Sequence, residues 1–457
     1  MARGKKKETL TPEERLQATL VPESEQPYPV PENWCWTYLG CVSDVVTGGT
    51  PSKKHPEYYG GLFPFFKPTD LDFGRHVVEA SEYLTDEGKM VSRIIPEQST
   101  AVCCIGSIGK CGFLEVEGTT NQQINSAIPK FNPLFLYYYC NTHYFNEELW
   151  SKASATTISI VNKSKMESCV FPLPPLPEQL RIVDRIESLF AKLDEAKQKA
   201  QDALDSFETR KAAILHKAFT GELTAQWRKE HGIGMESWEQ IQFSELTSDV
   251  RLGLVRSKAE QSYESLHPYL KMNNITSDGT IDIADIVNID ATEDEVELFA
   301  LQYGDFLFNT RNSYELVGKN AVWNIDSQNK VLFNNNIMRV RFKHGINPFL
   351  VSFYLNSKEG KLELDKCKKN TTNIAAIYAK NLNQIQIPIM SKDEQTEIVR
   401  ILDVILAKEQ QAKEAAEGVL EQIDLIKKAI LARAFRGELG TNDPSEESAV
   451  ELLKVIV

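Results

Sequence analysis

The sequence lacks the features that mark several large classes of protein. No apolar run approaches the ~18–20 residues that a membrane-spanning helix needs, so we expect no membrane partner. None of the eight cysteines forms a CxxC pair, and no histidine lies at a ligand-like spacing from them. We therefore expect no metal site, and reduced thiols in a cytoplasmic protein. The polar N-terminus has no apolar stretch behind its basic residues, unlike a secretory signal.

Catalytic signatures are also missing. The sequence contains no GxSxG, HExxH or glycine-rich dinucleotide pattern. The run NPLF at Asn132 resembles the NPPY signature of amino-methyltransferases but lacks its second proline, and it suits a helix start. The run GSIGK, which ends at Lys110, lacks the spacing of a phosphate loop. We therefore expect no active site and no cofactor in this chain.

The chain has no excess of basic charge. It carries 51 basic and 64 acidic residues, a net charge of −13 and a pI near 5.3. Because neutralising phosphates supplies most of the sequence-independent affinity for DNA, a freestanding DNA-binding domain would usually be basic. A nucleic-acid role would therefore depend on local patches or on a basic partner. The length of 457 residues, 42% of them hydrophobic, predicts a packed protein of two or three domains.

What the sequence does contain is a direct repeat. The segment KAAILHKAFTGEL recurs 216 residues later as KKAILARAFRGEL, with 9 of 13 residues identical. Glu178 recurs as Glu394 at the same offset, and Trp34 matches Trp238 across regions that otherwise share little. Each half is therefore a variable region followed by a closely repeated segment.

The closely repeated segment predicts one long helix in each copy. Apolar or small residues recur at steps of four and three, the heptad spacing of a coiled coil, with Arg210 interrupting the first copy and Glu409 the second. About 42 residues at ~1.5 Å each would give a rod of roughly 60 Å. One amphipathic helix cannot bury its stripe alone, so we expect antiparallel pairing, either as a plain structural hairpin or as a spacer between the variable regions. The expected helix-interface residues are Ile186, Leu189, Leu193, Phe207, Ile214, Leu402, Ile405, Val419, Ile423 and Ile426.

The two variable regions predict α+β domains with a mostly β core. Short β-prone runs alternate with turn residues, and a helical run follows an Asn cap and a Pro in each region, at Asn132 and Asn347. Polar clusters fall on the predicted loops. Arg reads guanine and Asn or Gln reads adenine in the major groove, whereas Lys, Ser and Thr hold phosphates. Any one loop is read more simply as an ordinary polar turn, but the set together favours base readout. The candidate DNA-binding residues are Thr50, Ser52, Lys53, Lys54, Lys67, Thr69, Lys110, Asn121, Gln122, Gln123, Lys271, Asn273, Asn274, Arg311, Asn312, Asn334 and Asn335.

The order of these segments resembles the specificity subunit of type I restriction–modification enzymes. The resemblance rests on PLPPLPEQLRIVDRIESLF and KAAILHKAFTGELTAQWR, on their second copies DEQTEIVRILDVIL and KKAILARAFRGEL, and on the TGGTPSKK turn after Trp34. It covers the chain from about Asn33 to Leu439. It implies two target-recognition domains, each reading one half of a split, asymmetric DNA sequence, and two antiparallel coiled-coil helices that set the gap between the halves.

The resemblance also implies partners and a division of labour. Double-stranded DNA and two modification subunits would bind this chain, and restriction (translocase) subunits would join them. S-adenosylmethionine would sit in the modification subunits, which methylate adenine N6, and ATP with Mg in the partner subunits, so this chain itself would be non-catalytic. The expected divisions are an N-terminal extension (1–32), target-recognition domain 1 (33–175), spacer helix 1 (176–223), target-recognition domain 2 (224–390), spacer helix 2 (391–439) and a C-terminal tail (440–457).

Two alternatives remain open at this point. The chain could serve a methylation-only system, which sequence does not distinguish from a restriction system. It could instead be a coiled-coil scaffold whose variable domains bind proteins. Salt separates the scaffold from a DNA reader, because affinity that comes from phosphate contacts falls steeply as salt rises.

Overall fold

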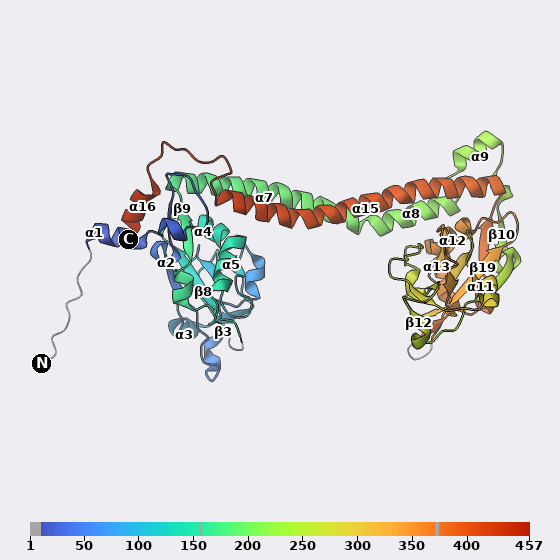
Figure 1. Cartoon of the computed structure of the whole chain (residues 1–457), viewed down its shortest axis with the longest axis horizontal. Helices are drawn as coiled ribbons and strands as arrows, with labels where there is room; N and C mark the ends of the chain where they lie inside the picture. Colours follow the sequence, from blue (N-terminus) through green and yellow to red (C-terminus); the bar gives the residue numbers. More distant parts are fainter. Residues whose placement is uncertain (1–10, 155–157, 371–373) are drawn as a thin grey trace. The chain divides into compact units, whose positions relative to one another are not determined.

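The computed structural model describes residues 11–154, 158–370 and 374–457. The chain divides into two units, one formed by Met1–Ala200 with Gly418–Val457 and the other by Gln201–Glu417. In each unit, sheets and short helices pack on one side of a pair of long helices (Figure 1). None of the helices within the described ranges is long and apolar enough to cross a membrane.

The first unit contains a four-stranded antiparallel sheet, a three-stranded sheet and one separate strand pair. In the three-stranded sheet, Phe66 of one strand pairs in parallel with Thr120 of another. The strands in sheet order are β2 (Ser43–Thr47), β8 (Ile124–Pro129), β5 (Thr100–Cys103) and β6 (Cys111–Phe113); then β4 (Glu82–Leu84), β3 (Tyr59–Phe66) and β7 (Thr119–Thr120); and β1 (Cys35–Tyr38) with β9 (Val170–Leu173).

The second unit repeats this topology and adds a small three-stranded sheet. One of its two four-stranded sheets has the same order as that of the first unit, the other again contains one parallel pair, and its first and last strands again pair with each other. These strands are β11 (Thr247–Leu252), β19 (Ile337–Phe342), β15 (Phe306–Asn309) and β17 (Asn320–Val322); then β12 (Gln261–Ser262), β14 (Val287–Ile289), β13 (His267–Leu270) and β18 (Leu332–Phe333); β10 (Glu239–Gln242) with β22 (Gln386–Ile389); and β16 (Arg311–Asn312), β21 (Ala375–Ala376) and β20 (Lys369–Asn370). In each domain, β-prone runs on either side of a polar turn form an antiparallel pair, β5–β6 in the first and β15–β17 in the second.

The helical run in each domain begins where the sequence predicts. Asn132 and Asn347 accept hydrogen bonds from backbone N–H groups of the first turn, and a proline follows each of them. Each run is two helices rather than one, because Thr142 and Ser357 cap a second helix directly after the first. The domain helices are α2 (Leu39–Val42), α3 (Asp86–Met90), α4 (Pro133–Cys140), α5 (His143–Ser151) and α6 (Lys163–Glu167) in the first unit, and α9 (Ala225–His231), α10 (Phe243–Leu246), α11 (Glu293–Phe299), α12 (Pro348–Asn356), α13 (Lys358–Cys367) and α14 (Ala379–Leu382) in the second.

The long helices pair antiparallel inside each unit. They are α7 (Leu176–Asp205), α8 (Phe207–Phe219) and α15 (Lys392–Ala434). In the first unit Lys427 pairs with Asp194 at 2.5 Å. In the second unit the two residues that interrupt the heptads meet each other, with Arg210 Nε 2.8 Å from a carboxylate oxygen of Glu409. A polar pair at the apolar seam of a coiled coil favours one register over others.

The structure confirms a long helix in each repeated segment, over residues 176–219 and 392–434. In the first copy a one-residue break at Ser206 separates α7 from α8. Arg210 donates to the Ala203 carbonyl and to the Ser206 hydroxyl at this break. The ends agree with the sequence, since Gly221 and Gly437, just beyond the helices, take positive φ values of 81° and 73°.

Residues outside the repeat complete the first unit. Helix α1 (Pro12–Thr19) and helix α16 (Ala449–Ile456) pack against its core through Leu16 and Leu453. The same core contains Phe135 of the domain together with Ile186 and Phe435, so the domain and the long helices of this unit share one hydrophobic cluster.

Candidate functional site

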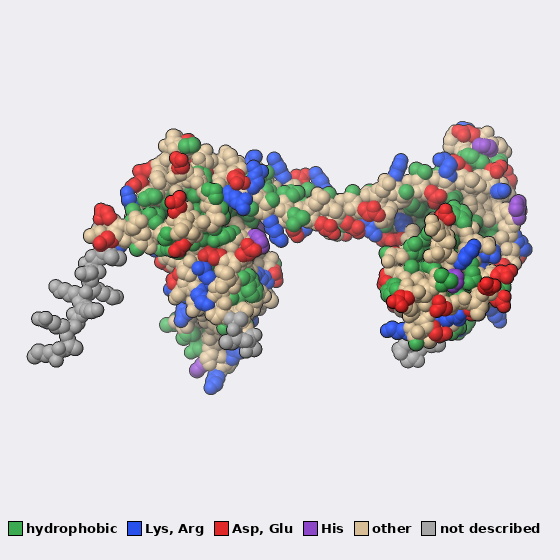
Figure 2. Space-filling view, in the orientation of Figure 1, with side chains coloured by type: hydrophobic (Ala, Val, Ile, Leu, Met, Phe, Trp, Pro, Cys, Tyr) green, Lys and Arg blue, Asp and Glu red, His purple; other side chains and the backbone are tan. Residues whose placement is uncertain are grey.

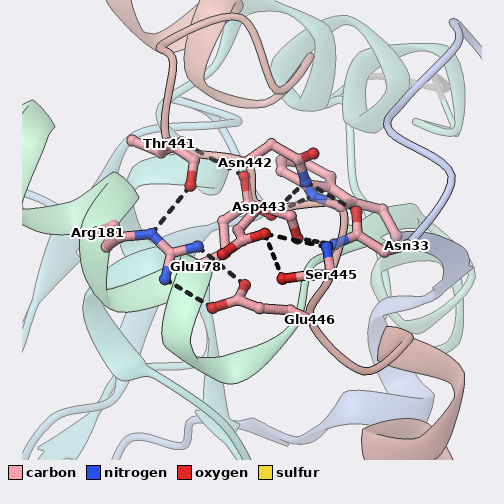
Figure 3. Close-up of polar contacts among 9 residues, drawn as sticks. Asn33, Glu178, Arg181, Thr441, Asn442, Asp443, Ser445 and Glu446 are labelled. Atoms are coloured by element: carbon pink, nitrogen blue, oxygen red, sulfur yellow. Dashed lines mark hydrogen bonds and ion pairs between the residues drawn. The ribbon is translucent and has the colours of Figure 1, made fainter.

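A buried glutamate at the start of α7 anchors the first domain to the helices. Glu178 is fully buried, and its carboxylate accepts hydrogen bonds from Trp34 Nε1 at 2.7 Å and from Asn442 Nδ2 at 2.8 Å. Asn442 also donates to the Asn33 side chain, and Arg181 binds Glu446 through both of its terminal nitrogens (Figure 3). The residues after the second GEL sequence therefore close this site.

The second unit contains a corresponding anchor with different donors. Glu394 is fully buried and accepts from Trp238 Nε1 at 3.0 Å and from Thr224 Oγ1 at 2.8 Å. Arg228 adds a cation, with Nη1 2.7 Å from the carboxylate. Here the residues after the first GEL sequence close the site. The repeated tryptophans and glutamates are thus explained by contacts between indole N–H groups and buried carboxylates.

The glutamine that follows each glutamate fixes the domain helix. Gln179 accepts from the backbone N–H of Asn132 at 3.1 Å, and Gln395 accepts from that of Asn347 at 2.9 Å. Each amide also donates to a nearby backbone carbonyl. The repeated Glu-Gln pair therefore holds both the first strand region and the helix start of its domain.

Three predicted loops of the first domain come together. Gly48 N donates to the Ile124 carbonyl at 2.9 Å, and Gly49 N donates to the Thr120 carbonyl at 2.8 Å. Thr50 donates to the Gln122 side chain at 2.5 Å. The loop after β5 joins them, since Cys104 N donates to the carbonyl of Gln123 at 2.7 Å. Loops 47–55, 104–110 and 119–125 therefore form one surface.

The second domain gathers its loops through the same backbone contacts. Gly253 N donates to Ile337 O at 3.2 Å, and Leu254 N donates to Phe333 O at 2.8 Å. Thr310 N donates to Asn336 O at 2.8 Å, as Cys104 N does to Gln123 in the first domain. Loops 252–256, 309–319 and 332–337 thus correspond to the three loops of the first domain.

Two glycines that the sequence reading did not single out make this packing possible. A Cβ on Gly48 would lie 2.2 Å from the Asn121 carbonyl oxygen, and one on Gly253 would lie 2.2 Å from that of Phe333. Each glycine lies three residues after a Ser-Asp-Val triplet that occurs in both halves, at residues 43–45 and 248–250, so comparing the halves beyond this triplet would have found them. Arg93 was also missed; it is exposed and donates to the carbonyl of Thr47 at the base of the first loop.

The candidate DNA-binding residues differ in how far solvent can reach them. Asn121 and Asn274 are buried, and their side chains bond to their own loops. Lys67 pairs with Glu82 and Lys110 with Asp72, while Gln123, Lys271, Asn312, Asn334 and Asn335 are half-buried. The exposed candidates are Thr50, Ser52, Lys53, Lys54, Thr69, Gln122, Asn273 and Arg311.

The expected helix-interface residues also divide by exposure. Those buried within their own unit are Ile186, Phe207, Leu402 and Ile423, and those half-buried are Leu189, Leu193, Ile214 and Ile405. Val419 and Ile426 are exposed, at 39% and 42%. Across the described ranges there is no group of three or more His, Cys, Asp and Glu side chains that could hold a metal ion.

The repeated domains match one known family. The type I restriction modification DNA specificity domain matches residues 31–204 and 235–418, one match for each half. The chain belongs to this family. The sequence-based prediction of a type I specificity subunit is therefore confirmed, as is its fold class of two repeated α+β domains with long helices.

Individual type I specificity subunits resemble the chain along most of its length. The specificity subunit of the EcoKI enzyme of Escherichia coli K12 is 23% identical over 427 residues, which cover 90% of each chain. The StySPI subunit of Salmonella potsdam is 21% identical over 432 residues, again 90% of each. A crystal structure of the HsdS subunit from Thermoanaerobacter tengcongensis matches with a TM-score of 0.62 at 20% identity, covering 91% of this chain and all of that one.

Another solved structure, from a study of complex assembly and conformational transition in the type I system, matches with a TM-score of 0.68. It covers 90% of this chain and all of that chain at 21% identity. Both structural matches support the fold of this type I specificity-family chain.

Proposed function

We propose that this chain is the DNA-reading subunit of a type I restriction–modification assembly and that it recognises a split, asymmetric target. One observation carries the proposal. The two domains gather topologically equivalent loops but place different side chains on them, with Gln122 and Gln123 in one where the other has Asn335 and Asn336. Two domains that share one loop arrangement but carry different polar side chains suit two unlike half-sites rather than a palindrome.

The charge distribution favours reading DNA together with partners. Acidic and basic side chains are interspersed over each unit on the face drawn in Figure 2. With a net charge of −13, the chain would need basic surface from other subunits to enclose a duplex. We therefore propose two modification subunits that carry S-adenosylmethionine, and restriction subunits that use ATP with Mg, as partners in the cytoplasm.

The domain divisions made from the sequence belong to the same proposal. Residues 33–175 and 224–390 would read the half-sites, and helices 176–223 and 391–439 would set the gap. The exposed loop residues are the ones we propose to touch DNA; among them, Lys53 and Lys54 suit phosphates and Arg311 suits guanine. Buried Asn121 and Asn274 would act by shaping their loops.

The test is single-molecule mapping of N6-methyladenine in a host that expresses the chain with its neighbouring modification subunit. A split motif that is methylated only when this chain is present supports the proposal. Replacing Arg311 by Ala should relax specificity in one half-site only, by about 1–3 kcal/mol of base discrimination. If both halves change, or neither does, Arg311 does not read a base. If an active modification subunit yields no motif, the scaffold alternative replaces the proposal.

A further inference from the structure

A cavity of about 540 Å³ lies between the domain and the long helices of the second unit. Its walls come from α8, α12, α15 and the loop that contains Asp278, all within this unit. Most of the wall is apolar, with Phe207, Phe349 and Phe353 among the lining residues, and Asp403 of α15 also lines it. We call it the Asp403 cavity.

The repeat shows what fills the same place in the first unit. Glu187 of α7 lies 216 residues before Asp403, the offset that relates the two long helices. Its carboxylate accepts from Arg75 Nε at 3.2 Å and from the Tyr138 hydroxyl at 3.2 Å. The Arg75 guanidinium also pairs with Glu115 of its own domain at 2.7 Å and lies over the Phe113 ring, 4.7 Å from its centroid. A guanidinium thus bridges the helix carboxylate to a carboxylate and an aromatic ring of the domain.

The second unit lacks counterparts of the Phe113 ring and the Tyr138 hydroxyl, which fill the corresponding space in the first unit. Strand pairing shows that Val322 corresponds to Phe113. Phe113 lies opposite the first residue of β5, and Val322 lies opposite the first residue of β15, the equivalent strand. Counting from the capping asparagines, Ser352 stands where the first unit has Tyr137, and Phe353 stands in place of Tyr138. Smaller side chains and a lost hydroxyl leave the space open.

Among the described residues of the second unit, no cation replaces the arginine. The loop after the matching 3-10 turn carries Asp278, whose carboxylate lies 3.0 Å from Lys211 Nζ. The lining contains three ionisable residues, and these two neutralise each other. Within the described part of the chain, the Asp403 side chain has no hydrogen bond or ion pair, and Asp403 is exposed to solvent at the edge of the cavity. Partial desolvation there raises the pKa of its carboxyl group.

We propose that the Asp403 cavity receives an arginine side chain from a protein subunit that assembles with this chain. The guanidinium would pair with Asp403 and stack against the phenylalanine rings, as Arg75 does within the first unit. This proposal rests on the proposed function for its partner subunits, but it does not depend on whether the loops read DNA.

The surface beside the cavity favours a polypeptide over a free small cation. Lys211 lines both the Asp403 cavity and a second hollow of about 360 Å³ between α8 and α13. That hollow includes Leu362, whose side chain is 53% exposed. A chain segment that inserts an arginine could cover both hollows, whereas a single small cation would fill only the first.

The first experiment tests the chemistry on the full chain. N-acetyl-L-arginine amide and its uncharged isostere N-acetyl-L-citrulline amide are titrated by saturation-transfer NMR. Because an ion pair that solvent can reach contributes about 0–1 kcal/mol, the arginine compound should bind up to about fivefold more tightly. Asp403→Asn should abolish this preference, and Glu417→Gln, which changes an exposed carboxylate of the same helix, should keep it. Equal binding of the two compounds, or a preference that survives Asp403→Asn, overturns the proposal.

The second experiment decides whether the arginine belongs to a protein. Dissociation of the modification and restriction subunits of the proposed assembly is followed by biolayer interferometry. Asp403→Asn and Val322→Phe, which narrows the cavity, should each speed dissociation of one subunit about tenfold, while Glu417→Gln leaves it unchanged. Unchanged dissociation in both variants overturns the protein occupant, even if the arginine amide binds. Methylation mapping at saturating subunits should return the same motif for Asp403→Asn, so that failure here is distinct from failure of DNA recognition.

Discussion

Replacing Arg228 by Met should destabilise the second unit by about 3–5 kcal/mol, the range for removing one partner of a buried ion pair. The carboxylate of Glu394 is fully buried, and the Arg228 side chain is only 9% exposed. The guanidinium also donates to the Thr224 hydroxyl and to the carbonyl of Gly221 at 2.5 Å. Without it, the donors that remain to the buried charge among the described residues would be Thr224 and Trp238.

The first unit provides the matched control. Arg181 is 40% exposed and pairs with Glu446 near the surface, where ion pairs contribute about 0–1 kcal/mol, so Arg181→Met should cost little. A second control removes both charges of the buried pair. The double variant Arg228→Met with Glu394→Gln should recover much of the lost stability, because no uncompensated charge then remains.

The assay is urea unfolding, followed by tryptophan fluorescence and circular dichroism. The fluorescence of Trp238 reports on the site itself, since its indole nitrogen binds Glu394. The midpoint of the transition should fall clearly in Arg228→Met and barely in Arg181→Met. The reasoning is refuted if the two single variants lose the same stability, or if the double variant is no more stable than Arg228→Met alone.

Two further predictions concern packing and thiol chemistry. Gly48→Ala should lower the free energy of unfolding by about 1–3 kcal/mol and weaken recognition of one half-site, because its Cβ would lie 2.3 Å from the Thr120 carbonyl oxygen. Gly49→Ala is the control, since nothing lies within 4 Å of the added carbon. Urea denaturation measures the stability of both variants, and methylation mapping measures their half-site recognition. Equal effects of Gly48→Ala and Gly49→Ala would contradict the steric argument. Burial raises the pKa of Cys111 to about 12, so its unreactive thiol form dominates at pH 8 and persists until the pH approaches that value. Iodoacetamide at pH 8 should therefore label the half-exposed Cys41 well before Cys111, as read by mass spectrometry; rapid labelling of Cys111 in the native chain would contradict this.

Much of the architecture follows from signals that lie close together in the sequence. The heptad spacing predicted the long helices, and the capping asparagines with their prolines predicted where α4 and α12 begin. Each of these patterns depends on residues within one or two helical turns of each other, so it can be recognised without knowing how the rest of the chain folds. The break at Ser206 was not predicted, because the apolar spacing continues across it and a long side chain, Arg210, folds back onto the turn.

The candidate site was predictable only in part. The polar loops could be found, yet the sequence did not separate the exposed Gln122 from the buried Asn121, its neighbour. Turn residues bind bases or their own backbone with the same atoms, and the choice depends on which groups the fold turns toward solvent. The close approach of Gly48 to another loop was likewise invisible without the strand pairing that brings the loops together.

By itself, the sequence determined that the chain is duplicated, that each half is an α+β domain followed by a long helix, and that the family is one of type I specificity subunits. The duplication is visible in the sequence because matching segments at a constant offset can be compared without knowing the structure. Only the tertiary structure decided that Glu178 and Glu394 bind indoles, that just one of them has a cation, and that Asp403 borders an open cavity while Glu187 holds an arginine. These differences arise between residues far apart in the chain, and they depend on which side chains meet after folding.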